Sequence, residues 1–245
     1  MKILITGSHG MLGTDIVNLL REKMSSPTHN DDLEVIEAPH EKLDITLEDE
    51  VSDFISRHKP DIIINCAAFT NVDKCETERE IAFKVNALGP KYIAAAAKEC
   101  GARVIHISTD FVFDGNSDRP YIEEDQTNPL SEYGRTKLEG ERNIQNHCNA
   151  FLIVRTSWLF GHNGTNFVEK MLELAGHNKE LSIVTDETGS PTYTADLAGA
   201  LWTLIKQECE GTFHVANEGS CSRYEWAKNI FETRGYNINI HPIKS

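Results

Sequence analysis

The sequence predicts an α/β protein with a doubly wound parallel sheet of the Rossmann type and a small C-terminal substrate lobe. Short β-branched runs alternate with helical stretches, a glycine loop follows the first run, and Asp61–Asn65 is apolar with a polar residue at each end. Such alternation indicates a parallel sheet covered by helices on both faces, and strands buried on both faces are apolar throughout. We expect a dinucleotide-binding domain over residues 1–157. A substrate lobe should occupy residues 158–245, truncated and interleaved with the first domain.

The elements are expected in regular order along the first domain. The predicted strands are rich in Ile, Leu and Val; they are Lys2–Thr6, Leu33–Ile36, Asp61–Asn65, Arg103–Ser108 and Phe151–Thr156. The predicted helices have apolar residues at helical spacing; they are Met11–Lys23, Leu47–His58, Ile81–Lys98 and Ser131–Gln145. The long polar loop Asp110–Leu130 leaves the carboxyl end of a strand, which is where open α/β sheets bind ligands.

The pattern is looser after residue 157. Helices are expected at Phe167–Ala175, Ala195–Lys206 and Arg223–Arg234, with short strands at Ser182–Val184, Thr212–Val215 and Ile238–Ile240. The shortness of these strands favours a small lobe over a second large sheet.

The composition excludes several classes of function. The chain has 245 residues, 38 acidic and 24 basic, and a formal net charge of −14. This balance argues against general binding to nucleic acid and to anionic membranes. No apolar run approaches the roughly 20 residues of a membrane span, and the glycine loop begins too early for a signal peptide. We therefore expect a cytoplasmic protein, with six scattered cysteines that form no disulfide framework and no metal site.

The glycine loop predicts dinucleotide binding. Gly7, Gly10 and Gly13 follow the first strand and open a helix. The first allows a tight turn, the second lets the backbone approach a pyrophosphate, and the third permits close helix–strand packing. The helix N-terminus then offers free N–H groups to phosphate.

The identity of the cofactor is less sharply indicated. An acidic residue about 20 positions after the loop would hold a ribose 2′-hydroxyl. Glu37 is a candidate, although strand alternation equally permits it to face away, and Ala38 and Pro39 carry no acid. His40 is expected to lie near a 2′-phosphate if the cofactor carries one. These residues favour NADPH, with NADH as the other possibility.

A catalytic constellation follows further along the chain. Tyr133 and Lys137 are four residues apart in a predicted helix and share one face. A nearby ammonium lowers the pKa of a tyrosine, as a proton-transferring tyrosine requires. Ser108, Thr109 and Asp110 end the fourth predicted strand, where a hydroxyl would meet Tyr133 over a bound nicotinamide.

Taken together, these motifs resemble the extended short-chain dehydrogenase/reductases, and more closely the dTDP-4-dehydrorhamnose reductase family. The resemblance runs from residue 1 to about residue 235. The segments that carry it are Thr6–Gly13, Leu43–Thr46, Asn65–Glu76, Val85–Ala87, His106–Gly115, Tyr133–Lys137, Arg155–Gly161, Asp186–Thr192 and Gly211–Asn217.

The resemblance implies a role for individual residues. Thr109, Tyr133 and Lys137 would form the catalytic triad, and Asp110 and Trp158 would contact the sugar together with Thr109. The cofactor would be held by Gly7, Gly10, Met11, Leu12, Gly13, Asp44, Ile45, Ala68, Phe69, Thr70, Tyr133 and Lys137. Asn86 would be a structural partner near the site. Arg155 would either contact the anionic part of the substrate or form a salt bridge at a strand end.

The implied activity is NAD(P)H-dependent reduction of the 4-keto group of a nucleotide-activated deoxysugar, such as dTDP-4-dehydro-L-rhamnose. The alternatives are an epimerase or dehydratase acting on sugar nucleotides, and a non-catalytic NAD(P)-binding regulatory subunit. Phe111 stands where dehydratases typically have Glu, which disfavours dehydration. The family usually continues beyond the position of Ser245. Some relatives bind Mg²⁺ at a dimer contact near the position of Asp15; a homodimer is possible here, but no metal is predicted.

Overall fold

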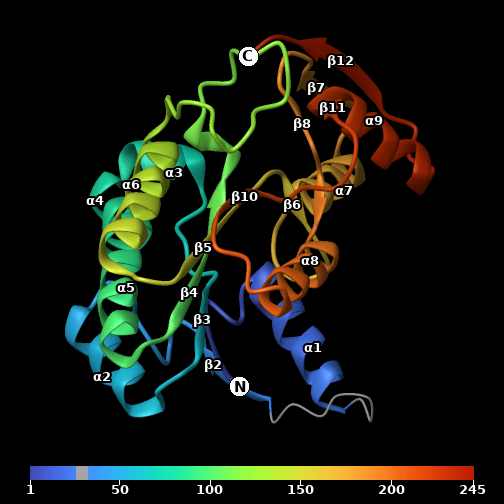
Figure 1. The fold of residues 1–245 in the computed structure, drawn as a ribbon. Helices are drawn as coiled ribbons and strands as arrows, with labels where there is room; N and C mark the ends of the chain where they lie inside the picture. Colours follow the sequence, from blue (N-terminus) through green and yellow to red (C-terminus); the bar gives the residue numbers. More distant parts are fainter. Residues whose placement is uncertain (26–32) are drawn as a thin grey trace.

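The computed structural model describes residues 1–25 and 33–245. Its centre is a six-stranded sheet in the order β10-β5-β4-β3-β1-β2, and every pairing in it is parallel. The strands are β1 (Lys2–Thr6), β2 (Glu34–Ala38), β3 (Ile62–Asn65), β4 (Arg103–Thr109), β5 (Phe151–Thr156) and β10 (Gly211–His214). Helices cover both faces (Figure 1), which confirms the predicted doubly wound fold.

Most helices lie close to their predicted positions, but the helix at Val72–Thr77 was not predicted. The helices are α1 (Met11–Ser25), α2 (Glu48–His58), α3 (Val72–Thr77), α4 (Arg79–Phe83), α5 (Gly89–Cys100), α6 (Glu132–His147), α7 (Phe167–His177), α8 (Thr194–Lys206) and α9 (Arg223–Arg234). In Figure 1, α2 to α6 lie on one side of the sheet, and α1 and α8 lie on the other.

Strand alternation builds a separate core on each face of the sheet. Ile62 and Ile64 of β3 face the cluster that includes α1 and α8, whereas Ile63 between them faces the cluster that includes α2 and α5. All three side chains are buried. The run of Ile62 to Ile64 is therefore apolar because both of its faces are covered, as predicted.

One predicted helix is interrupted by a π turn, so the prediction of a single regular helix is wrong. In place of one helix over Ile81–Lys98, the chain forms α4, a π-helical turn η1 (Lys84–Leu88) and then α5. Asn86 lies in the π turn and directs its side chain to the backbone of Phe69. Pro90, the second residue of α5, has no N–H to continue an α-helical ladder. A π turn inserts one residue into a helix, and such turns are frequent at functional sites.

The C-terminal lobe has its own small core. Residues of α7 and α9 pack there with β7 (Glu180–Val184) and β12 (Asn239–Ile243), which pair in parallel. Two further pairings were not predicted: β6 (Leu159–Phe160) with β9 (Thr192–Tyr193), and β8 (Thr188–Gly189) with β11 (Cys221–Ser222). Each of these strands has only two residues, too few to show an alternating pattern.

Part of the second half of the chain packs with the first. α8 contributes Leu197, Leu201 and Ile205 to the core against α1, and β10 pairs with β5 at the edge of the large sheet. We propose that the two units divided at residue 157 are interleaved, because β10 belongs to the large sheet and α8 packs on it.

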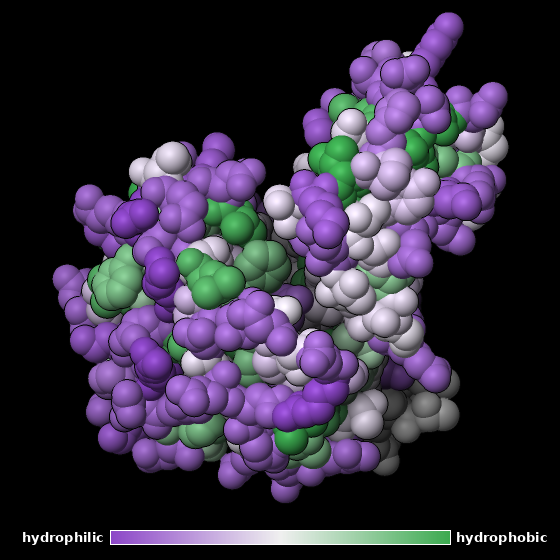
Figure 2. All heavy atoms as spheres, turned by 90° about the horizontal axis from the view of Figure 1, so that it is seen from above, coloured by the Kyte–Doolittle hydropathy of each residue, from purple (hydrophilic) through white to green (hydrophobic). Residues whose placement is uncertain are grey.

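The face shown in Figure 2 is mostly hydrophilic, and it is hollowed between the larger body and the projecting lobe. Within residues 1–25 and 33–245, no helix has the length and apolar character needed to cross a bilayer.

Candidate active site

The glycine loop lies where the strand order reverses, between β1 and β3. Gly7 has a positive φ of 64°, and a Cβ there would stand 2.8 Å from the backbone nitrogen of Ala67, which follows β3. A Cβ on Gly13 would collide with the carbonyl oxygen of Gly7. The loop is therefore folded tightly between the two strand ends, in the crevice where doubly wound sheets bind nucleotides.

The residues around this loop fit a dinucleotide. A cavity of about 650 Å³ is lined by Gly7, His9, Gly10, Pro39, His40, Glu41, Leu43, Asp44, Ile45, Thr46, Cys66, Ala67, Ala68, Phe69, Ile81, Lys84 and Val85. The Ser8 hydroxyl in the loop is buried and finds no hydrogen-bond partner in the described part of the chain. A buried hydroxyl without a partner is unfavourable, and a phosphate oxygen at the N-terminus of α1 would supply one.

We expect the Gly13→Ala substitution to weaken both cofactor binding and folding. Its Cβ would also stand 2.8 Å from Ser8 Cα, so the loop must shift, and overpacking of this kind costs about 1–3 kcal/mol. We expect NADPH affinity, measured by calorimetry, to fall at least about tenfold, which corresponds to 1.4 kcal/mol.

The matched control for this substitution is Gly199→Ala. Gly199 lies in α8, and a Cβ there would meet nothing within 4 Å. We expect this variant to bind NADPH normally and to gain up to about 1 kcal/mol in the free energy of unfolding. Unchanged affinity in the Gly13→Ala protein would contradict the proposed place of the pyrophosphate.

The loop after β3 joins the cofactor cavity to the reactive side chains. The Asn86 side chain accepts from the Phe69 N–H at 2.9 Å and donates to the Phe69 carbonyl at 3.0 Å. It also donates to the Thr136 hydroxyl of α6 at 3.2 Å. The π turn thus ties this loop to the helix that carries Tyr133 and Lys137, and Asn86 is the structural partner that was expected.

The structure brings Thr109, Tyr133 and Lys137 together between β4 and α6. The Thr109 hydroxyl donates to the Asp110 carboxylate at 3.1 Å and accepts from the Phe111 N–H at 3.2 Å, and it lies close enough to the Tyr133 phenol to lower the pKa of that phenol. The Lys137 amine donates to the Ile107 carbonyl of β4 at 2.6 Å, and this side chain is almost fully buried. α6 can approach the Phe111 carbonyl closely because Gly134 has no side chain, and a Cβ there would collide with that carbonyl.

Burial governs the titration of this cluster. It raises the pKa of Tyr133, an effect that the Asp110 carboxylate adds to and the hydrogen bond with Thr109 opposes. Burial also lowers the pKa of Lys137 to about 8, against the opposing effects of Glu141 and Cys66. A phenol that stays protonated near neutrality is the form that a proton donor requires. The expected lowering of the Tyr133 pKa is therefore not seen in this structure, because burial outweighs any effect of the Lys137 ammonium.

Arg155 forms a buried ion pair, the second of its two predicted roles. Its guanidinium donates to the Glu141 carboxylate of α6 at 3.0 and 2.7 Å, with side-chain exposures of 8% and 2%. Ser108 donates to the same carboxylate at 2.5 Å. The Glu141 carboxylate therefore links α6 to β5 through Arg155 and to β4 through Ser108, the residue before Thr109. The sequence carried no signal for Glu141, which appears there as one acid among several on a helix.

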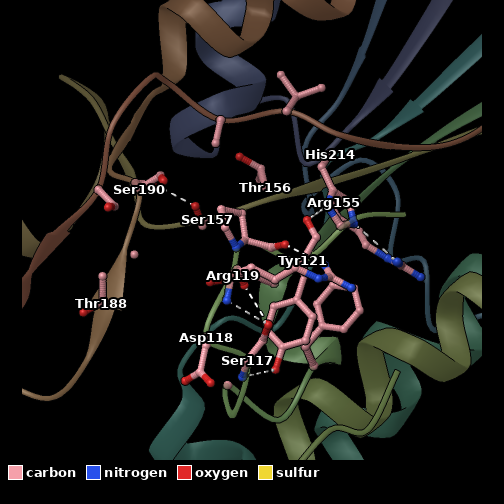
Figure 3. Close-up of a pocket in the computed structure, with 18 of the residues that line it drawn as sticks. Ser117, Asp118, Arg119, Tyr121, Arg155, Thr156, Ser157, Thr188, Ser190 and His214 are labelled. Carbon is pink, nitrogen blue, oxygen red and sulfur yellow. Dashed lines mark hydrogen bonds between the residues drawn. The ribbon is translucent and has the colours of Figure 1, made fainter. Parts of the chain in front are cut away.

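The expected substrate residues lie on two neighbouring clefts. Asp110 lines a cleft of about 600 Å³, together with residues of the loop after β4, the end of β5, and residues 186–190 and 214–220. Figure 3 shows Arg155, Tyr121 and His214 gathered on one side, and Ser157 reaching Ser190 across it. Trp158 lines a second cleft of about 530 Å³ with Thr70. Asp110 and Trp158 thus face different parts of the hollow between the two units.

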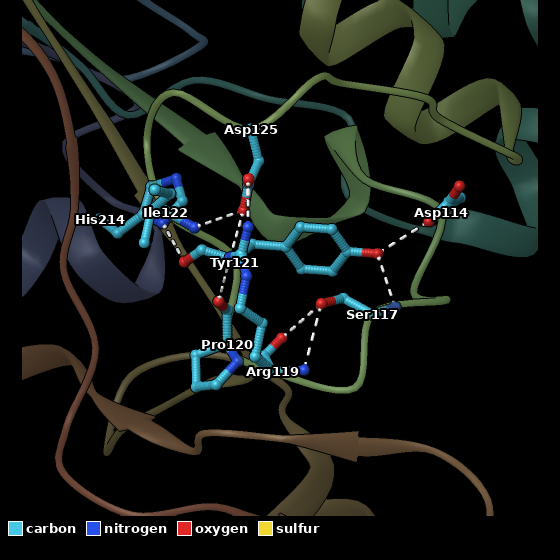
Figure 4. A network of polar contacts seen from close by, with 8 residues as sticks. All are labelled: Asp114, Ser117, Arg119, Pro120, Tyr121, Ile122, Asp125 and His214. Carbon is cyan, nitrogen blue, oxygen red and sulfur yellow. Dashed lines mark hydrogen bonds and ion pairs between the residues drawn. The ribbon is translucent and has the colours of Figure 1, made fainter.

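The loop after β4 forms a fixed wall of the larger cleft (Figure 4). The Asp114 carboxylate accepts from the Tyr121 hydroxyl at 2.7 Å, and Arg119 forms a two-pronged ion pair with Asp125 at 2.8 and 2.7 Å. His214 of β10 contacts the Tyr121 carbonyl through Nδ1 at 3.1 Å. These bonds hold the loop against the sheet, so this wall is formed before any ligand arrives.

The cofactor residues expected from the sequence are only partly gathered at one cavity. Gly7, Gly10, Asp44, Ile45, Ala68 and Phe69 line the 650 Å³ cavity. Thr70 lines the 530 Å³ cleft instead, and Leu12 and Gly13 are buried at the start of α1. Met11 packs next to Gly164, since a Cβ built on that glycine would lie 3.6 Å from the Met11 Cβ. Only the backbone N–H groups of these helix residues remain available to a phosphate.

Two acidic residues considered from the sequence are engaged elsewhere. Glu37 pairs with Arg21 of α1, and it is not among the residues that line the cavity. Asp15 accepts hydrogen bonds from Asn163 and Thr194. No group of three or more His, Cys, Asp or Glu suited to a metal ion occurs in the described ranges.

The parallel sheet has a phosphate-binding glycine loop at its switch point and a cluster of Thr, Tyr and Lys at the end of β4. These features define a nucleotide-dependent oxidoreductase of the short-chain dehydrogenase type. A family model described as "RmlD substrate binding domain" matches residues 1–245. The chain belongs to this family.

Relatives agree with this assignment over nearly the whole chain. Spore coat polysaccharide biosynthesis protein SpsK of Bacillus subtilis is 41% identical over 239 residues, covering 98% of this chain and 81% of that protein. The dTDP-4-dehydrorhamnose reductase of Escherichia coli is 38% identical over 237 residues, covering 95% and 78% respectively.

Solved structures show the same fold. A dTDP-4-dehydrorhamnose reductase from Clostridium acetobutylicum superimposes with a TM-score of 0.94 at 43% identity, covering 100% of this chain and 84% of that one. The Bacillus anthracis reductase in complex with NADP gives a TM-score of 0.92 at 38% identity, with the same coverages.

Proposed function

We propose that this protein reduces the 4-keto group of a dTDP-activated deoxysugar, converting dTDP-4-dehydro-L-rhamnose to dTDP-L-rhamnose with NADPH. The observation that carries the proposal is the cluster of Thr109, Tyr133 and Lys137 between β4 and α6. Its link to the cofactor cavity through Asn86 and Phe69 supports it. So do the names of the relatives from Escherichia coli and Mycobacterium tuberculosis, which are dTDP-4-dehydrorhamnose reductases.

The proposed cofactor is NADPH, with NADH as a weaker alternative. Support comes from the Bacillus anthracis structure, which is described as a complex with NADP, and from the cavity itself. Glu37 is paired with Arg21, and Glu41, which lines the cavity, is paired with His9. His40 lines the cavity just after β2, where a basic group favours a 2′-phosphate. When bound, the reduced nicotinamide supplies the hydride that the carbonyl carbon accepts.

The residues of the chain would complete the reduction. Tyr133 would donate its phenolic proton to the carbonyl oxygen as the C–H bond forms, so that the ketone becomes an alcohol. Thr109 would donate a hydrogen bond to the same oxygen and stabilise its developing charge. Lys137 would hold the cofactor ribose and favour the phenolate that Tyr133 becomes, before solvent returns the proton.

The substrate residues would act in binding. Asp110 would accept from a sugar hydroxyl, and Trp158 would pack against the ring. Their two clefts, of about 600 and 530 Å³, offer space for the nucleotide and the sugar. A relative from Streptomyces niveus is named dTDP-4-keto-6-deoxy-D-glucose reductase, so the sugar configuration is the feature to test.

The test is nicotinamide oxidation by the purified chain with dTDP-4-dehydro-L-rhamnose and, separately, dTDP-4-keto-6-deoxy-D-glucose. We expect sustained turnover with NADPH, slower turnover with NADH, and a higher kcat/KM for the rhamnose precursor. A dehydratase or epimerase would convert a sugar nucleotide without net loss of NADPH. A regulatory subunit would bind NADPH with no turnover, and either result would overturn the proposal.

A further inference from the structure

Arg223, the first residue of α9, lies against three aromatic rings of the lobe. Its guanidinium carbon is 3.5 Å from the Trp158 ring centroid, 5.1 Å from that of Phe167 and 5.9 Å from that of Trp226. Only 19% of the side chain is exposed. The shortest of these distances corresponds to direct stacking, in which a cation is attracted by the face of the indole.

Trp158 is held in an unusual conformation by its neighbours. Its φ of 47° lies in the left-handed region, which bulky residues rarely adopt. A Cβ on Gly189 would stand 2.7 Å from the indole Nε1, so the ring packs directly on glycine backbone. Gly189 and Arg223 therefore both restrict the orientation of the indole plane.

The charge of Arg223 also reaches the reactive end of the sheet. Its carboxylate partner Glu187 is 3.5 Å away and about half exposed. The guanidinium also lowers the pKa of Asp110, next to the reactive Thr109, against the larger effect of burial. Arg223 and Trp158 line the same cleft as Thr70. A guanidinium keeps its charge at every pH at which an enzyme works, so this influence on Asp110 is permanent.

We propose that Arg223 is a positioning residue of the substrate site, which fixes the plane of the Trp158 indole. The proposal rests on the reductase function proposed above, in which Trp158 packs against the sugar ring. It explains why a lobe residue that is remote in sequence matters to this contact.

The groups around Asp110 determine in which direction its pKa changes when Arg223 is replaced. Burial raises its pKa to about 6; the Thr109 hydroxyl, the N–H groups of Asp110 and Phe111, and Arg223 all oppose the rise. From α6, Tyr133 faces the same carboxylate. Removing the charge of Arg223 must therefore raise the Asp110 pKa further, and Asp110 becomes protonated at a higher pH.

The test compares Arg223→Met with Arg223→Lys and with a matched control, Arg234→Met. Arg234 is exposed at the other end of the same helix, so its loss removes an equal charge from α9. The full-length proteins are titrated by carbon NMR of the Asp110 carboxyl, assigned through Asp110→Asn. The Trp158 indole N–H resonance is assigned through Trp158→Phe.

In Arg223→Met we expect the Asp110 pKa to rise by about 0.5 pH unit and the indole resonance to move. Arg223→Lys should keep the Asp110 pKa near its wild-type value and still move the indole resonance, because lysine retains charge but lacks the planar group. Arg234→Met should change neither. An unchanged indole resonance in folded Arg223→Met protein would overturn the proposal, whatever the Asp110 titration shows.

Kinetics separate this proposal from the proposed function. In Arg223→Met we expect KM for the sugar nucleotide to rise about tenfold with a smaller change in kcat, and the acidic limb of kcat/KM to move to higher pH together with Asp110. Arg223→Lys should restore the acidic limb. Absence of turnover in the wild-type protein would refute the reductase function alone, because the NMR shifts do not depend on activity.

Discussion

Replacing Tyr133 by Phe should lower kcat for the keto sugar by about 10²–10⁴-fold, the usual contribution of a positioned proton donor. The ring of Phe can keep the edge contact with Phe111, whose centroid lies 5.5 Å from that of Tyr133. Only the hydroxyl beside Thr109 is lost. NADPH affinity should therefore stay within about twofold of wild type, and the deficit should appear in steady-state kcat.

The control for this variant is Tyr236→Phe, which removes a hydroxyl from an exposed tyrosine of the lobe. It should turn over at the wild-type rate. If Tyr133→Phe retains more than about a tenth of wild-type kcat, another group donates the proton, because loss of a positioned acid costs at least about a hundredfold. If the variant also loses NADPH binding, the tyrosine acts in assembling the site and the proposed role is wrong.

The sheet could be predicted because its physical causes are local. β1, β5 and α9 have the predicted bounds, since a buried strand must be apolar along its length and Ser222 with Glu225 forms a capping box before α9. Tyr133 and Lys137 were found for the same reason, as one helix face needs only a fixed spacing.

The remaining features depend on partners that are distant in sequence. The π turn at Asn86 exists because Phe69 accepts and donates at that point, and no periodicity encodes such a pairing. Glu37 could be assigned to Arg21 only once α1 was placed beside β2. In the sequence, Arg223 is one basic residue at the start of a predicted helix, and only the folded structure shows that it stacks on Trp158.

Glu141→Gln should be the most destabilising conservative change in the site, lowering the free energy of unfolding by about 3–5 kcal/mol. Gln has nearly the same shape, but it leaves the buried guanidinium of Arg155 without a carboxylate. It also weakens the bond from Ser108. Urea unfolding followed by circular dichroism measures the change. kcat should fall too, because this pair fastens α6 to the strand that ends at Thr109.

The control lies two residues earlier on the same helix. Glu139 and Arg142 are paired at 3.4 Å with both side chains exposed, so Glu139→Gln should cost no more than about 1 kcal/mol. The double variant Glu141→Met with Arg155→Met removes both buried charges and should recover most of the lost stability, because no unpaired charge remains. A Glu141→Gln protein as stable as Glu139→Gln would show that Arg155 finds another partner, and the ion pair would then not be what fixes α6 beneath the reactive threonine.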